Sequence, residues 1–417
     1  MFVSNYNIPV IDVPEGLKDL ITDGYNFIKN NTEQHRCDIL ELNFMGQKVV
    51  CLSGEEGARL FYDSERFQRY GAVPMRVQKT LFGVNAVHTM DGQGHIHRKQ
   101  LFLSLMRKKE KKVAQLVMKN WESRIDRWAT SKNVVLFDEA KDVLCSAACQ
   151  WAGIELPESE VKKRADELIA MVDALGGLGP RYYVGKLARI KTEKWLGGII
   201  DDVRNGRLKP EENTALFKIA FFKELDGKEL SSQMAAVELL NIIRPMVAIS
   251  LLVTFTALAI HKHPEHKEKL LLDSSFREMF VQEVRRYYPF VPVLGARSRK
   301  GFTWKGCEFK EKMLVILDVY GINHDPRIWD DPDKFNPRRF EDFDSSLYNF
   351  IPQGGGDPTK THRCPAEPIT IEVLKNTLDF LANKITYDVP DQNLSYSLKR
   401  APSLPQSGFI ISNVKWR

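Results

Sequence analysis

The sequence predicts a mainly α fold, in which a large helical domain carries small β-sheets at its periphery. From about residue 110 to residue 290, the chain is a series of amphipathic segments with short breaks and few strand signals. Within that region, residues 235–260 are apolar almost all round, which is typical of a helix at the centre of a fold. Strand-like pieces follow at 293–298, 301–304 and 313–319. No repeat, low-complexity tract or flexible linker divides the chain, so residues 1–417 are expected to form a single unit.

The first 60 residues are expected to add a small β element. Residues 40–44 and Gln47–Leu52 alternate or run apolar, and residues 43–46 can turn between them. This pattern predicts a β-hairpin. A helix is expected to begin directly afterwards, at Gly54.

The composition narrows the classes of protein that fit. Hydrophobic residues make up 43% and charged residues 27%, as in a globular protein with a sizeable core. The net charge of +6 is mild for this length, and no segment is basic enough to indicate nucleic-acid binding. We expect no membrane span and no signal peptide, because long apolar runs are missing. The six cysteines show no paired framework, which favours a reducing, cytoplasmic setting.

One cysteine stands at the end of a constrained loop. Residues 350–364 contain three glycines and two prolines, so they are predicted to form neither helix nor strand. The apolar pattern after Cys364 is helical. The start of a helix favours a thiolate, and His362 and Arg363 add positive charge. A thiolate at Cys364 can serve as a nucleophile or a metal ligand, and an ordinary buried cysteine is the alternative.

A phenylalanine, a glycine-rich loop and a basic residue before a cysteine that opens a helix resemble the heme-ligand loop of the cytochrome P450 superfamily. The resemblance implies the cytochrome P450 fold and a heme b with the Cys364 thiolate as axial ligand of its iron. His362 stands where the family usually has arginine, and Ala366 where it usually has glycine.

The resemblance also implies residues that hold the heme propionates. His95 and Lys99 occupy the places of a histidine and a basic residue that contact a propionate in the family. Arg69 and Arg297 are further candidates, and His362 belongs to the same predicted cofactor site. Apart from the resemblance, His95 and His97 together are a weak candidate for a metal site, because a third ligand is missing.

The apolar helix at 235–260 carries a charge and a helix breaker in its middle, Arg244 and Pro245. Proline removes one helical hydrogen bond and frees the carbonyl of Asn241, which predicts a bend. A buried arginine costs several kcal/mol unless it meets an anion. It is expected either to pair with a carboxylate of the core, to reach solvent, or to bind an anionic substrate in an apolar pocket.

The Arg-Pro pair resembles the fatty-acid peroxygenase and decarboxylase branch of the superfamily, because monooxygenases carry an acid and an alcohol at this point. The resemblance implies that Arg244 binds the carboxylate of a long-chain fatty acid, which then acts as the acid–base catalyst. Hydrogen peroxide would replace dioxygen and electrons, with no obligatory reductase. The expected products are 2- and 3-hydroxy fatty acids and terminal alkenes.

His88 lies in a loop that overhangs the distal face of the heme in this branch. Members carry glutamine or histidine there, and histidine is associated with more decarboxylation. We therefore expect His88 to act as a proton source near neutral pH, with an appreciable share of alkene. Leu81, Phe82 and Phe290 are candidates for the acyl channel, and core packing is the alternative for each.

Two further motifs are a pair of opposite charges and a group of three histidines. Glu283 and Arg286 stand one helical turn apart, and the resemblance implies a structural lock between them and the arginine-bearing segment 336–340. His261, His263 and His266 could bind a metal, but Pro264 interrupts them, so an exposed helix end is the preferred interpretation.

Three other functions compete with the peroxygenase reading. A reductase-dependent monooxygenase would need an outside electron donor, because no flavin or iron–sulfur motif is visible. A non-catalytic heme-binding protein would need an output domain. A cysteine-nucleophile enzyme would contain no heme at all.

Overall fold

The computed structural model describes residues 8–12, 23–44, 47–177 and 179–417. About half of the chain is helical (53%), and the predicted mainly α class is confirmed. The helices are α2 (Phe27–His35), α3 (Gly54–Phe61), α4 (Met75–Val77), α5 (Gly92–Met106), α6 (Glu110–Glu122), α7 (Ile125–Thr130), α8 (Leu136–Ala152), α9 (Glu158–Asp173), α10 (Pro180–Arg204), α11 (Ala215–Ala220), α12 (Ser232–Lys262), α13 (Lys267–Leu272), α14 (Ser274–Tyr287), α15 (Val319–Ile322) and α16 (Glu367–Asp379).

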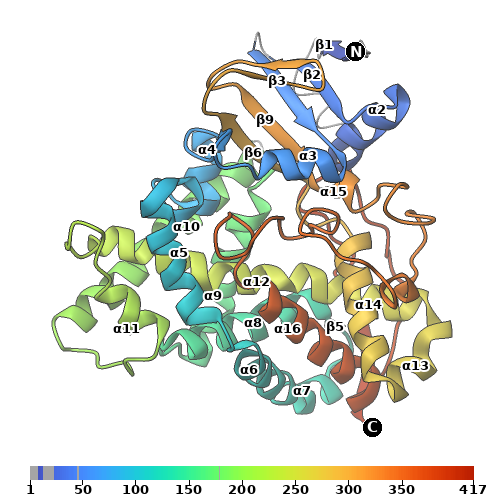
Figure 1. Ribbon diagram of the computed structural model, residues 1–417. Helices are drawn as coiled ribbons and strands as arrows, with labels where there is room; N and C mark the ends of the chain where they lie inside the picture. The colour runs from blue at the N-terminus through green and yellow to red at the C-terminus, as the bar shows by residue number, and fades with distance from the viewer. Residues whose placement is uncertain (1–7, 13–22, 45–46, 178) are drawn as a thin grey trace.

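The strands gather mainly at one end of the molecule, above the helical region (Figure 1). The described residues contain the strands β1 (Val10–Asp12), β2 (Ile39–Phe44), β3 (Gln47–Leu52), β4 (Phe67–Gln68), β5 (Val134–Val135), β6 (Val293–Ser298), β7 (Phe302–Trp304), β8 (Cys307–Phe309), β9 (Leu314–Asp318), β10 (Ile385–Asp388) and β11 (Ile410–Trp416). They form a six-stranded sheet in the order β1-β2-β3-β9-β6-β4, a three-stranded sheet in the order β10-β11-β5, and the pair β7-β8.

The predicted hairpin is confirmed, since β2 and β3 pair antiparallel from Ile39 opposite Leu52 to Phe44 opposite Gln47. Residues 45–46 of its expected turn lie outside the described residues. The strands predicted at 293–298, 301–304 and 313–319 are also present, as β6, β7 and β9, within one residue of the predicted bounds. The helix expected at Gly54 is α3.

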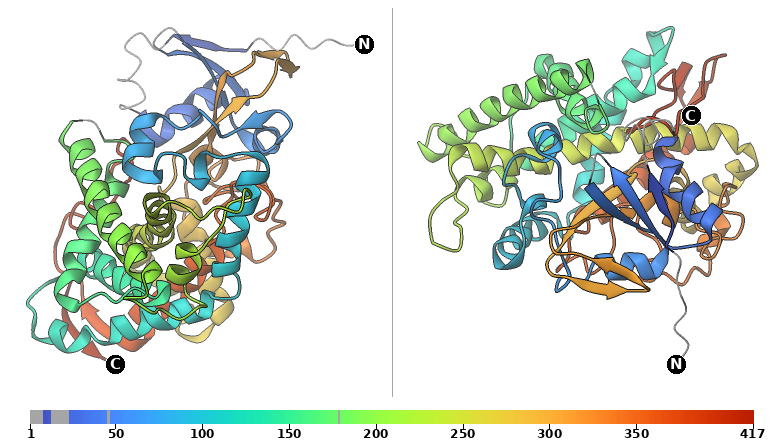
Figure 2. Two further views of the ribbon diagram at one scale, coloured as in Figure 1. Left: turned by 90° about the vertical axis from the view of Figure 1, so that its left-hand side faces the viewer. Right: turned by 90° about the horizontal axis from the view of Figure 1, so that it is seen from above.

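Helix α12 runs through the middle of the helical region, as the views from two further sides show (Figure 2). Its start is capped by the Ser231 hydroxyl, which accepts a hydrogen bond from the N–H of Met234 at 3.1 Å. Its sequence is apolar enough to cross a membrane, but 94% of the apolar window is buried inside the protein. It is therefore the core helix that the sequence predicts, and it continues through Pro245.

The predicted lock between α14 and the segment after it is confirmed. Arg286 Nε and Nη2 donate to the two carboxylate oxygens of Glu283 at 2.7 and 2.8 Å. Arg339 Nε also donates to Glu283, at 3.3 Å, and the N–H of Asn336 does so at 2.8 Å. Arg286 is 1% exposed, so these charges compensate each other away from water. The lock fixes the chain between α14 and the loop that leads to Cys364.

We expect the replacement Arg286→Leu to lower the free energy of unfolding by about 3–5 kcal/mol, because it leaves a buried carboxylate without its main partner. Urea unfolding followed by far-UV circular dichroism measures this change. The matched control is Lys163→Ala, which breaks the Glu160–Lys163 pair at the same spacing on an exposed surface and should leave the midpoint nearly unchanged. Equal midpoints for the two variants would contradict the role of the lock.

Candidate active site

The loop before α16 holds Cys364 by several hydrogen bonds. The N–H of Cys364 donates to the carbonyl of Gln353 at 3.1 Å, and Gln353 Nε2 lies 3.8 Å from the Cys364 sulfur. The N–H of Gly355 donates to the hydroxyl of Tyr62 at 2.8 Å. The residue is half-buried, and its thiol lies deep among protein atoms. The loop thus fixes the position of one sulfur atom just before α16.

The expected stable thiolate is not what the chain produces by itself. Burial raises the pKa of the Cys364 thiol above its ordinary value, and this effect exceeds the lowering by the Ala366 N–H and by Lys99. The Ala366 N–H, just before α16, therefore offsets the effect of burial on this pKa only in part. Coordination to a metal ion would remove the proton, because a metal-bound thiol is deprotonated outright.

Four basic groups lie together beside this loop: Arg69, His95, Lys99 and His362. The rings of His95 and His362 stack with centroids 3.9 Å apart, and Lys99 Nζ donates to the carbonyl of Arg363 at 2.7 Å. Burial, with help from Lys99, lowers the pKa of His95 to about 4, and burial lowers the pKa of Lys99 to about 8. Among the described residues, none of the four forms an ion pair within 4 Å. The cluster is a buried positive site that lacks its anion.

Arg297 is placed differently from the other predicted propionate ligands. It lies on β6, opposite Gln68 of β4, and donates to the carbonyls of Gly71 and Lys312, each at 2.6 Å. Arg69, by contrast, is buried with its guanidinium 4.1 Å from the ring centroid of Phe61. The structure therefore brings together four of the five predicted propionate ligands, whereas Arg297 bonds to backbone oxygens at the edge.

Arg244 is 5% exposed and has no carboxylate partner among the described residues. Its Nε makes no hydrogen bond, and its guanidinium lies 6.0 Å from the ring centroid of Phe82. Burial, together with the charge of Arg189, lowers the pKa of Arg244 to about 9, so it remains a cation near neutral pH. The expectation of a core carboxylate partner is thus wrong, and the side chain does not reach solvent. Pro245, directly after it, is half-buried in an otherwise buried helix.

The three channel candidates Leu81, Phe82 and Phe290 come together in one apolar cluster. Ala248 and Leu251 of α12 belong to it, with Val172 of α9 and a few neighbouring side chains. Residues 244, 248 and 251 lie on one face of a helix, because they are spaced by four and then three positions. The cation of Arg244 therefore faces the same side as this apolar cluster.

His88 lies next to the same cluster, with its ring stacked on Phe82 at a centroid distance of 4.7 Å. Its Nδ1 is buried without a hydrogen-bond partner. Burial and then the charge of Arg244 lower the pKa of His88 to about 3. It is therefore neutral near pH 7, so it would take part as a hydrogen-bond donor or acceptor, whereas the sequence led us to expect a residue that gives up a proton near neutral pH.

Sequence reasoning missed the residues that position this part of the site. Asn241 Nδ2 donates to the carbonyl of Phe82 at 2.8 Å, and Arg189 Nη1 donates to the carbonyl of Leu81 at 2.7 Å. Asn241 lies three positions before Arg244, a spacing that already indicates a shared helix face. Nothing in the sequence distinguishes Arg189 from the other basic residues of α10, so its role could not be predicted.

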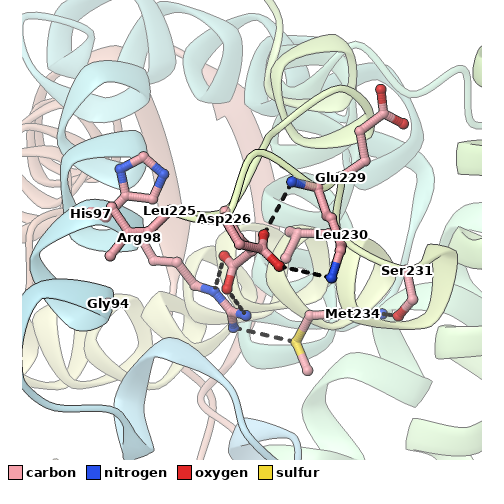
Figure 3. Close-up of a pocket in the computed structure, with 11 residues that line it drawn as sticks. Gly94, His97, Arg98, Leu225, Asp226, Glu229, Leu230, Ser231 and Met234 are labelled. Atoms are coloured by element: carbon pink, nitrogen blue, oxygen red, sulfur yellow. Dashed lines mark hydrogen bonds and ion pairs between the residues drawn. The ribbon is translucent and has the colours of Figure 1, made fainter.

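The alternative metal site at His95 and His97 is not formed. His95 stacks on His362, whereas His97 Nε2 lies 2.8 Å from the carbonyl oxygen of Lys223. His97 lines a separate surface hollow of about 420 Å³ between α5 and the segment before α12 (Figure 3). Arg98 closes its inner side through ion pairs with Glu224 and Glu238, each at 2.8–2.9 Å. The lining of the hollow mixes charged and apolar side chains, and it shares no residue with the cluster next to Arg244.

Comparisons with known proteins agree with this geometry. A family model described as cytochrome P450 matches residues 257–361. The 9-beta-pimara-7,15-diene oxidase of Oryza sativa subsp. japonica is 29% identical over 31% of this chain and 26% of that protein. Taxane 10-beta-hydroxylase of Taxus cuspidata is 27% identical over 56% of this chain and 52% of that protein. The chain thus spans less than two thirds of the length of either relative.

Solved structures match over nearly the whole chain. Cytochrome P450EX alpha (CYP152N1) with myristic acid has a TM-score of 0.94 and 41% identity, over 98% of this chain and 99% of that chain. Cytochrome P450SP alpha (CYP152B1) with (R)-ibuprophen has a TM-score of 0.93 and 41% identity, over 96% and 98%. A cytochrome P450 OleT variant with arachidonic acid has a TM-score of 0.95 and 35% identity, over 99% of both chains.

The chain belongs to the cytochrome P450 family. Within the family it falls in the fatty-acid peroxygenase and decarboxylase branch to which the CYP152 structures belong. The predicted cytochrome P450 fold is confirmed.

Membership of the cytochrome P450 family implies a heme with a cysteine thiolate ligand, and the residues present fit that group. Cys364 supplies a sulfur atom held by the loop before α16, and a cysteine sulfur is the donor that heme-thiolate proteins use. The basic cluster beside it lacks an anion, and the two propionates of a heme would supply negative charge. We propose that Arg69, His95, Lys99 and His362 hold these propionates and that Arg297 supports them from the edge.

We expect Arg69→Leu to speed the transfer of heme to apomyoglobin by about ten- to a hundredfold, because a hydrogen bond to a charged group contributes about 1.5–3 kcal/mol. The transfer is followed as a change in heme absorbance. The control is Arg66→Leu, which removes a nearby arginine paired with Asp63 at the surface and should leave the transfer rate unchanged. If Arg69→Leu retains heme as well as the wild type does, the propionate assignment is wrong.

Proposed function

We propose that this cytochrome P450 uses hydrogen peroxide to oxidise long-chain fatty acids at carbons 2 and 3. The products are 2- and 3-hydroxy fatty acids and, by oxidative decarboxylation, terminal alkenes. The single observation that carries the proposal is Arg244, a buried cation without a counter-ion that faces an apolar cluster. A fatty acid supplies both missing parts, a carboxylate and an apolar chain.

The neighbouring structures support this substrate class. Cytochrome P450EX alpha was solved with myristic acid and the OleT variant with arachidonic acid, both of which are fatty acids. In the present chain, the guanidinium of Arg244 offers a planar fork of N–H donors that suits two carboxylate oxygens. Leu81, Phe82 and Phe290 would contact the first part of the acyl chain, because they share a cluster with Ala248 on the Arg244 face of α12.

When bound, the heme b supplies the redox chemistry of the reaction, with Cys364 as its thiolate ligand. Arg244 keeps the substrate carboxylate ionised and in one place. A carboxylate held in this way can accept a proton from hydrogen peroxide and return it to the departing oxygen. General acid–base catalysis of this kind contributes about a hundred- to ten-thousandfold to a rate.

The fixed carboxylate also determines which carbons react. With its head bound at Arg244, the substrate exposes the carbons next to the carboxylate and not the far end of the chain. Phe82 limits where the chain next to the carboxylate can lie, because its carbonyl is held by Asn241 and its ring stacks on His88 and lies 6.0 Å from the guanidinium of Arg244. Attack at carbons 2 and 3 follows from this arrangement.

Hydrogen peroxide is the oxidant in this proposal, in place of dioxygen and electrons from a reductase. The Arg244-Pro245 pair leaves no acid and alcohol side chains to pass protons at this point of α12. The substrate carboxylate takes over that task, so no electron-transfer partner is obligatory. We place the enzyme in the cytoplasm, since its free cysteines suit a reducing compartment.

The decisive experiment gives the purified enzyme a long-chain fatty acid and hydrogen peroxide alone. We expect Arg244→Leu to lose at least about a hundredfold of this turnover, because it removes the group that holds the acid–base catalyst. Short carboxylates such as acetate should restore part of it, since they can enter the space that the guanidinium vacates. Chromatographic analysis of the products measures the rate.

The conservative variant Arg244→Lys should retain part of the activity, since it keeps the charge but loses the fork. Lys191→Met, an exposed change on α10, is the control and should behave as the wild type. All variants are compared at equal heme content. Normal fatty-acid turnover by Arg244→Leu would refute the proposal, and turnover only with a reductase and nicotinamide would favour a monooxygenase.

We expect His88→Gln to lower the share of terminal alkene relative to hydroxy acids. The imidazole of His88 has a free Nδ1 beside Phe82 and Arg244, and it can bond to the carboxylate that is lost as carbon dioxide. Glutamine keeps a polar group but not the aromatic stack on Phe82. The ratio of alkene to hydroxy acids, measured by gas chromatography, tests this role, and an unchanged ratio would rule it out.

A further inference from the structure

A second cluster of metal-binding side chain types lies far along α12 from Arg244. The helix ends at Lys262, and the short turn Pro264–His266 follows before α13. Pro264 begins this turn and folds the chain back. As a result His263, Glu265 and His266 converge, although an exposed helix end was the preferred interpretation of the sequence and a metal site the alternative.

The ligand atoms of the three side chains lie within 4.8 Å of one another. His263 Nδ1 is 3.2 Å from Glu265 Oε1, and His266 Nε2 is 3.9 Å from the same oxygen. Ligand atoms of a tetrahedral zinc site are about 3.3 Å apart, given zinc–nitrogen bonds of about 2.0–2.1 Å. The cluster is therefore within about 1.5 Å of a coordinating arrangement, and the exposed Glu265 can adjust.

Both imidazole rings are held in place by aromatic neighbours. The His263 ring stacks on Phe335 with centroids 4.5 Å apart, and the His266 ring contacts Phe276 at 5.4 Å. The side chains of His263 and His266 are 25% and 18% exposed, so one side of the cluster is open to solvent. A metal ion could enter from that side and keep a water molecule as its fourth ligand.

We propose that His263, Glu265 and His266 bind one divalent transition-metal ion of the zinc type. Two imidazole nitrogens and one carboxylate oxygen suit Zn²⁺, Cu²⁺ or Ni²⁺, whereas Mg²⁺ and Ca²⁺ prefer sites made of oxygen alone. Lys269 and Arg338 act on His266 electrostatically and repel a cation. We therefore expect a dissociation constant on the order of micromolar and not that of a deeply buried structural site.

The bound ion would join three parts of the chain. It would link the end of α12 to the turn before α13, and through the stack of His263 on Phe335 to the segment that follows. The next residue, Asn336, donates to Glu283 in the lock of α14. Metal binding at this corner should thus stabilise the folded protein.

The test uses the untagged, heme-containing enzyme, treated with a chelator and then titrated with zinc chloride in a calorimeter. We expect one site with a dissociation constant on the order of micromolar, and a thermal unfolding midpoint that rises with zinc and not with magnesium. His266→Ala and Glu265→Gln should each weaken zinc binding by about tenfold or more, because a ligand is lost. Both variants should lose the zinc-dependent rise of the midpoint.

The matched control is His261→Ala, since His261 lies near the same helix end but packs its ring against Phe409. This variant should bind zinc as the wild type does. Equal binding by His266→Ala and the wild type, or an equal loss in His261→Ala, would overturn the proposal and indicate an adventitious ion only. Since zinc binding is measured without fatty acid or peroxide, its outcome is independent of the proposed reaction.

Discussion

A guanidinium held away from water without a counter-charge is the constraint on which the rest of this structure depends. An unpaired buried charge costs several kcal/mol, and the neighbouring charge of Arg189 adds to that cost at Arg244. A fold tolerates such a group only where the surrounding chain prevents it from turning to solvent. Helix α12 provides that restraint, since it is buried over almost its whole length. A carboxylate that binds at Arg244 removes this unfavourable free energy, and the difference contributes to the binding of the carboxylate.

The loop of residues 81–87 is held in place by α12 and by α10. Gly83 adopts a φ of 91°, a region that side chains rarely enter, and a Cβ atom there would lie 2.5 Å from Arg189 Nη2 and from Val237. Arg189 can therefore approach the backbone closely enough to bond the carbonyl of Leu81. The N–H of Val87 is held in turn by Glu238 at 2.9 Å. The position of Phe82 thus follows from contacts with two helices and not from the loop itself.

Much of the fold and several site residues could be predicted because their signals are local. The apolar run of α12, the hairpin of β2 and β3, and the turn-spaced Glu283 and Arg286 each follow from short-range patterns, and each is confirmed. The charge state of Cys364 and His88 could not be predicted, because burial decides it and burial depends on the whole fold.

Contacts between segments that are far apart in the sequence could not be predicted either. The partners of Arg189 and the convergence of Glu265 with two histidines depend on how helices end and meet, which no periodicity records. The sequence indicated function most clearly at residues whose chemistry does not match that of their neighbours, such as a charged residue inside an apolar helix. Such conflicts are visible without coordinates and often mark functional positions.

The six-stranded sheet imposes an order on how the chain can fold during its synthesis. Val49 of β3 pairs with Leu314 of β9, and β9 in turn joins β6, so strands made early stay without their neighbour until late in translation. At about 5–20 residues per second, that wait is on the order of tens of seconds. An unpaired β3 edge is exposed to other nascent chains during this time. The helices encoded in between can assemble first, and the ribosome then delivers the strand that closes the sheet.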